Sequence, residues 1–120
     1  MIKYGDIMSL RFDELRTANA NRGVEWCGKK TGIEDMEFCA IELGGESGEA
    51  LDAVKKYLRF LNGWKGGVEQ EQAVDAIAKE LADVVICADR LAESLGIDLG
   101  EAVKRKFNIT SDRYNLSVKL

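Results

Sequence analysis

The sequence contains no histidine and no proline, and both absences limit what the protein can be. Without imidazole, the chain cannot provide a histidine general base, an HExxH zinc site or the Glu-x-x-His ligands of a di-iron bundle. Any metal site must therefore depend on oxygen ligands, which suit Mg²⁺ or Mn²⁺. Without proline, long helices can run uninterrupted, and the turns between them depend on glycine.

Cysteine, long apolar runs and clustered positive charge are also scarce. The three cysteines are odd in number and lack CxxC spacing, so we expect neither a disulfide framework nor a thiolate zinc site. No apolar run approaches the roughly 18 residues of a membrane span, and the N-terminus has no signal-peptide profile. The net charge is −4, and the basic residues are scattered apart from residues 104–106. We therefore expect a cytoplasmic protein with neither nucleic acid nor membrane as a partner.

The remaining composition predicts a single globular domain over residues 1–120. Apolar spacing predicts helices over about residues 6–21, 33–61, 70–95 and 98–114, with a loop from Asn21 to Gly32. Asp98 is placed to cap the last helix, with Glu101 three residues later in a pattern similar to a capping box. Because the connections are short and no strand pattern alternates, we expect an all-α fold resembling a four-helix bundle.

Two acidic pairs, Glu46/Glu49 and Glu80/Asp83, interrupt the apolar pattern of the two longest helices. Residues three apart lie on the same side of a helix. At about 100° per residue, Glu46 and Glu49 border the apolar stripe of their helix, and Glu80 lies within the apolar side of the next. An isolated ionised carboxylate there is costly unless it is paired or binds a metal. We therefore predict that the two helices face each other and close these four carboxylates around a divalent cation.

Three glycines, Gly44, Gly45 and Gly48, accompany the first acidic pair. Each costs about 1 kcal/mol relative to alanine inside a helix. Close approach of another backbone, or space for a ligand beside Glu46 and Glu49, would offset that cost. The alternative is a helix that is kinked or that begins after these glycines.

The strings ELGGESGEALDAVKK and KELADVVICADRLAESLGIDLGEAVKRKFNITSDRY resemble the MazG-like nucleotide pyrophosphohydrolases, whose signature is ExxE followed one helix later by ExxD. The match extends over about three quarters of the chain, from near Arg22 to Tyr114. The resemblance implies an all-α enzyme that cleaves a nucleoside triphosphate between its α and β phosphates, leaving a monophosphate and pyrophosphate. It also implies a homo-oligomer, either a dimer or a tetramer.

The same resemblance assigns roles to individual residues. It implies that the four acids of the two pairs bind Mg²⁺, with Mn²⁺ as a substitute, and either Glu46 or Glu49 is expected to accept a proton from the attacking water. The positions implied to contact the nucleotide are Lys106 and Asn108 near the phosphates, Trp26 at the base, and Glu42 as an additional acid.

Three alternatives remain open from the sequence. In the first, the acids form surface salt bridges with Lys55, Lys56, Lys79 or Arg90, since charged residues are usually solvated. In the second, the fold is the same but the substrate is narrower, either dUTP or phosphoribosyl-ATP. In the third, the chain is a helical assembly module without catalytic activity, which Mg²⁺ and nucleotide would not stabilise.

Overall fold

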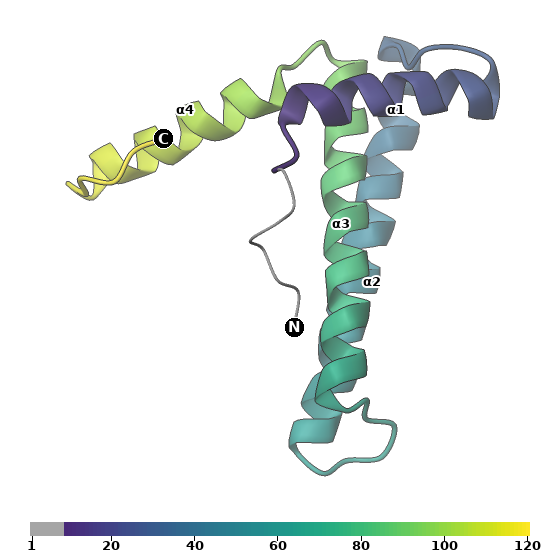
Figure 1. Cartoon of the computed structure of the whole chain (residues 1–120), viewed down its shortest axis with the longest axis vertical. Coiled ribbons are helices and arrows are strands. Elements are labelled where there is room, and N and C mark those ends of the chain that lie inside the picture. Colours follow the sequence, from purple (N-terminus) through teal and green to yellow (C-terminus); the bar gives the residue numbers. More distant parts are fainter. Residues whose placement is uncertain (1–8) are drawn as a thin grey trace.

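The computed structural model describes residues 9–120, and these residues form four helices without any strand (Figure 1). The helices are α1 (Phe12–Cys27), α2 (Met36–Leu61), α3 (Gln70–Ser94) and α4 (Leu99–Arg113), and a 3₁₀ turn, η1 (Ile33–Asp35), leads directly into α2. The all-α fold with four helices that the sequence predicts is therefore confirmed. No helix in the described part of the chain is both long enough and apolar enough to cross a membrane.

The centre of the fold is the pair formed by α2 and α3, which lie side by side over most of their length (Figure 1). The connection over residues 62–69 is short, so the two helices run antiparallel. Gly67 is required in this turn, because a Cβ atom there would lie 2.5 Å from the backbone nitrogen of Phe60. The buried apolar residues are small: Cys39 and Ala50 of α2, and Ala73, Cys87 and Ala92 of α3.

Helix α1 differs from its predicted bounds and corrects them. Predicted residues 6–8 lie outside the described part of the chain, and residues 9–11, also predicted as helix, are not helical. The helix continues to Cys27 through residues that the sequence assigned to a loop. It ends at Gly28, whose φ of 79° is left-handed and whose N–H donates to the carbonyl of Val24. Among residues 21–27 Gly23 alone is buried, so tertiary packing acts on this last part of the helix at that position.

Helix α4 begins at the predicted cap, where the Asp98 side chain accepts a hydrogen bond of 3.0 Å from the backbone of Glu101. Its first turn packs against α1, since a Cβ atom on Gly100 would lie 3.1 Å from the Cβ of Phe12. Beyond that contact α4 extends away from the α2–α3 pair, and the residues after it fold back along the helix (Figure 1).

Candidate metal centre

The pairing of α2 with α3 brings acidic side chains from both helices together. One carboxylate oxygen from each of Glu46, Glu80 and Asp83 lies within 4.8 Å of the other two. Glu49 is close enough for its charge to act on both Glu46 and Glu80. Because each acidic pair occupies one side of its helix, the antiparallel packing places the two pairs opposite each other. We refer to Glu46, Glu49, Glu80 and Asp83 as the acidic centre.

The acidic centre is an unfavourable environment for its own negative charge. Partial burial raises the pKa of Glu46, and the neighbouring Glu49 carboxylate raises it further. Partial burial likewise raises the pKa of Glu80, followed by the charge of Glu49. The Oε2 atoms of Glu46 and Glu80 are buried and have no hydrogen-bond donor within residues 9–120. Orphaned anionic oxygens that converge from two helices fit a divalent cation, whose oxygen ligands they would provide.

Within residues 9–120, no basic side chain forms an ion pair with the acidic centre. The basic residues expected as alternative partners bind other acids: Lys55 and Lys56 bind Asp52 at 2.9 and 3.0 Å, Lys79 binds Asp75 at 3.1 Å, and Arg90 binds Glu42 at 2.8 Å. The surface salt-bridge alternative is therefore wrong for the described part of the chain. No positive side chain of the described residues therefore compensates these carboxylates, which a bound cation would do.

The glycines beside the acidic centre leave open space. Helix α2 begins at Met36 and runs through Gly44, Gly45 and Gly48, so the alternative of a late-starting helix is wrong. A Cβ atom added at any of the three would meet no atom within 4 Å. No other backbone of the described chain approaches them, which leaves room for a ligand or for another molecule.

A pocket of about 310 Å³ lies between α1, the start of α2 and α3. The residues around it include Asn19, Arg22, Trp26, Phe38, Glu42 and Arg90. Two predicted nucleotide contacts, Trp26 and Glu42, therefore share one pocket, although 78% of Trp26 is exposed. Glu42 is one helical turn from Glu46, a rise of about 6 Å, so the pocket adjoins the acidic centre along α2.

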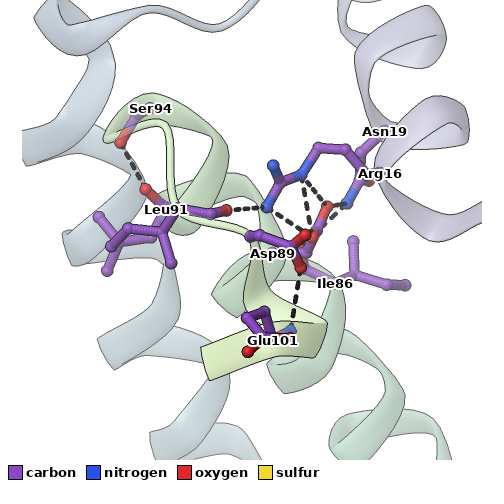
Figure 2. Close-up of polar contacts among 9 residues, drawn as sticks. Arg16, Asn19, Ile86, Asp89, Leu91, Ser94 and Glu101 are labelled. Carbon is purple, nitrogen blue, oxygen red and sulfur yellow. Dashed lines mark hydrogen bonds and ion pairs between the residues drawn. The ribbon is translucent and has the colours of Figure 1, made fainter. Parts of the chain in front are cut away.

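A buried polar network joins the pocket to the body of the protein (Figure 2). Asp89 of α3 is only 1% exposed, and it accepts hydrogen bonds from Arg16 and Asn19 of α1. Arg16 also donates to the carbonyl of Ile97 at 2.7 Å, between α3 and α4. Sequence reasoning missed this network because Asp89 lies about 180° around α3 from Glu80, on the side that periodicity assigns to solvent. It is buried only because α1 covers that side.

The two predicted phosphate contacts on α4 lie apart from the acidic centre of their own chain. Both Lys106 and Asn108 belong to the helix that extends away from the α2–α3 pair (Figure 1). The Asn108 amide is hydrogen-bonded to the backbone of Leu120, donating at 3.2 Å and accepting at 2.9 Å. The described chain alone therefore does not bring these residues to the carboxylates.

The chain is similar in sequence to a protein of a bacteriophage. It is 33% identical over 86 residues to the protein called "Gene 37 protein" of Mycobacterium phage L5, an alignment that covers 72% of each chain. No protein family's sequence profile matches the chain, and neither does any solved structure.

Proposed function

Since the chain belongs to the family of the Gene 37 protein of Mycobacterium phage L5, a name that states no activity, we propose its function from the site itself: a Mg²⁺-dependent nucleoside triphosphate pyrophosphohydrolase of MazG-like type. The observation that carries the proposal is the acidic centre, in which buried carboxylate oxygens have neither a donor nor a basic partner within residues 9–120. The residue strings that resemble the MazG-like enzymes support the same reaction. The location proposed with it is the cytoplasm.

The residues divide into two groups in this proposal. Glu46, Glu80 and Asp83 would hold the cation, with Glu49 beside them. A Mg²⁺ ion held there would supply positive charge against the phosphate oxygens and would lower the pKa of a bound water. Either Glu46 or Glu49 accepts a proton from the attacking water, and the α–β phosphoanhydride bond breaks to give a nucleoside monophosphate and pyrophosphate.

The pocket next to the acidic centre would hold the nucleoside. Trp26 offers an aromatic face for stacking against a base, and Phe38 is a second aromatic residue in the pocket. Glu42 lies in the pocket, where its ion pair with Arg90 holds it, rather than in the acidic centre. The triphosphate would then extend from the pocket along α2 and α3 to the four carboxylates.

A homo-oligomer is the second part of the proposal, because one chain leaves too much apolar surface uncovered. A compact monomer of 13.3 kDa would expose about 6,500 Å², whereas this chain exposes 9227 Å². The excess is about 2,800 Å² per chain, or about 5,600 Å² for two chains, which corresponds to a large permanent homodimer interface. The exposed apolar residues form stripes along both central helices: Leu51, Val54, Leu58 and Leu61 on α2, and Val74, Leu81 and Val85 on α3.

Association would also complete the site. Because α4 of one chain extends away from its own acidic centre, Lys106 is available to the acidic centre of a second copy, and Asn108 would become available by giving up its hydrogen bonds to Leu120. A cationic and an amide side chain are suitable donors to the phosphates. The exchange of contacts between identical chains is the usual consequence of two-fold symmetry.

The decisive experiment is pyrophosphate release from a panel of common NTPs and dNTPs, together with phosphoribosyl-ATP, with Mg²⁺ and with EDTA. We expect at least one substrate to yield its monophosphate and pyrophosphate only with Mg²⁺. Glu49→Gln and Asp83→Asn should each lower the rate at least about 100-fold, the effect of losing a general base or a charge-neutralising ligand, without loss of helicity. Asp75→Asn is the matched control, since Asp75 lies on α3 but binds Lys79.

The outcomes separate the alternatives. Turnover limited to dUTP or phosphoribosyl-ATP would identify a narrower enzyme of the same reaction class. Unchanged turnover in both active-site variants would contradict the assignment of the acidic centre. If no nucleotide is hydrolysed and neither Mg²⁺ nor nucleotide raises the melting temperature, the chain is an assembly module instead.

A further inference from the structure

The side-chain amide of Asn19 has a fixed orientation. Asn19 is 4% exposed, and its Nδ2 atom donates to Asp89 Oδ2 at 3.0 Å and to the Ile86 carbonyl at 3.3 Å (Figure 2). Both partners can only accept hydrogen bonds in these positions. Rotating the amide by half a turn would place its carbonyl oxygen against a carboxylate and a carbonyl. The network therefore determines which end of the amide faces Asp89.

The hydrogen bonds of Asp89 to its other neighbour, Arg16, keep its carboxylate in place as an acceptor for Asn19. The guanidinium of Arg16 donates from Nε to both oxygens of Asp89, at 3.1 and 3.2 Å, and forms an ion pair with it. Asp89 thus accepts hydrogen bonds from Arg16, and Asn19 is held as a donor towards it. With both amide hydrogens used, the only unsatisfied polar atom of Asn19 is its carbonyl oxygen, Oδ1, which has no hydrogen-bond partner within residues 9–120.

Asn19 is also part of the pocket wall, together with the aromatic residues Trp26 and Phe38. We infer that Asn19 determines base specificity: its carbonyl oxygen accepts a hydrogen bond from an N–H group on the Watson–Crick edge of the nucleobase in this pocket, and Asp89 is the positioning residue that fixes it as an acceptor. This inference rests on the nucleotide substrate proposed above. The network of Arg16, Asn19 and Asp89 would then serve base recognition in addition to stabilising the fold.

The distances along the helices agree with this placement. Arg90 of the pocket is seven residues from Asp83 of the acidic centre, a rise of about 10 Å along α3. Glu42 is about 6 Å from Glu46 along α2. A nucleotide that spans this interval places its base in the pocket when its phosphates reach the carboxylates. An acceptor that the fold holds in advance also gives selectivity without the cost of ordering it on binding.

Each pair of nucleotides in the test differs in one N–H donor group on the Watson–Crick edge of the base, and in two of the pairs a methyl group replaces the donor hydrogen. The pairs are CTP with the triphosphate of pyrimidin-2-one riboside, UTP with 3-methyluridine triphosphate, ATP with purine riboside triphosphate, and GTP with 1-methylguanosine triphosphate. For the preferred base, we expect the wild-type protein to favour the donor-bearing member about 10- to 100-fold in kcat/KM. In Asn19→Ala this preference should fall to nearly one, with the loss expressed mainly in KM.

A purely structural role for Asn19 would give a different result. Asn19→Ala would then lower kcat/KM for both members of a pair equally, and their ratio would not change, which would overturn the inference. Asn19→Ser is the second variant, because its hydroxyl still donates to Asp89 but does not present a fixed carbonyl. Should neither variant fold, equal use of both members by the wild-type protein would refute the inference by itself.

Binding separates this inference from the proposed reaction. The same pairs, prepared as α,β-methylene triphosphates that resist cleavage, are measured by calorimetry with Mg²⁺. A donor preference in binding that is lost in Asn19→Ala supports the role of Asn19 even if no pyrophosphate is released from natural substrates. Pyrophosphate release without any donor preference would leave the proposed function intact and remove the specificity assigned to Asn19.

Discussion

At the scale of single residues, the protein places charge where its own fold does not neutralise it. Glu46 and Glu80 are partly buried, each has an oxygen without a donor within residues 9–120, and both have a raised pKa. The basic residues one or two turns away bind Asp52, Asp75 and Glu42 instead. Such an arrangement lowers stability in the absence of a ligand, as functional sites commonly do.

The raised pKa of Glu80 predicts how stability depends on pH. Above the ordinary glutamate value of 4.5, the folded chain holds this proton more tightly than the unfolded chain does. The free energy of unfolding therefore falls as pH rises through the window between that value and the raised pKa. In EDTA, Glu80→Gln should become progressively more stable relative to the wild type over this window, as measured by urea unfolding at a series of pH values.

Adding Mg²⁺ should reverse the order at neutral pH, because the cation binds the wild-type carboxylates and stabilises only the state that binds it. Glu71→Gln, at an exposed position in the first turn of α3, provides the control and should show neither effect. A Glu80→Gln variant whose relative stability does not change with pH would show that Glu80 ionises as freely in the folded chain as in the unfolded one.

At the scale of elements, α2 combines a long helix with three glycines that weaken it. Their positions around the helix differ: at about 100° per residue, Gly45 lies about 40° from Glu49, whereas Gly44 lies about 140° from Glu49. A methyl group added at either position meets no atom within 4 Å apart from the neighbouring backbone of its own helix. A methyl group would thus fit equally well at Gly44 and at Gly45, but only the one at Gly45 would lie on the side of the helix that carries Glu49.

Gly45→Ala and Gly44→Ala form a matched pair for testing that space. Each should raise helix stability by up to about 1 kcal/mol, since alanine is the better helix former. Only Gly45→Ala should reduce pyrophosphate release, because its methyl group would enter the space beside the acidic centre. Thermal unfolding and initial rates measure the two effects, and full activity in Gly45→Ala would show that no ligand occupies that space.

At the scale of the whole molecule, one chain has an open shape. Its radius of gyration is 17.3 Å, compared with about 13.6 Å for a compact domain of this length. Helix α4 contacts the α1 end of the fold and the residues that follow it, and the apolar stripes of α2 and α3 remain exposed (Figure 1). A second copy that covers these stripes accounts for both features, and it would place α4 near a neighbouring acidic centre.

Oligomerisation can be tested by adding one charge to the uncovered surface. Leu81→Glu introduces a carboxylate into the exposed apolar stripe of α3, and we expect a smaller species by sedimentation velocity, a lower melting temperature and loss of activity. Gln72→Glu adds the same charge about 180° around the helix and should leave the assembly unchanged. A wild-type protein that sediments as a monomer at micromolar concentration would contradict this part of the proposal.

The sequence by itself determined the helices and the location of the acids. Apolar spacing gave α2, α3 and α4 within a few residues, and the Asp98 cap was correct, because these features depend on contacts between residues a few positions apart. The helical conformation of residues 22–27 could not be predicted from such local contacts. Gly23, close to Asn21, favours a loop locally, and Gly23 is buried by contacts with other elements that local sequence does not reveal.

Tertiary structure alone decided which polar groups meet. Periodicity placed Glu80 on the apolar side of α3 and Asp89 on the opposite side, but nothing local indicates that α1 covers Asp89 and brings Arg16 and Asn19 to it. The same holds for the pairing of Glu42 with Arg90, which are 48 positions apart. A helix fixes the angle of each side chain about its own axis, whereas the element that lies opposite depends on how the whole chain packs.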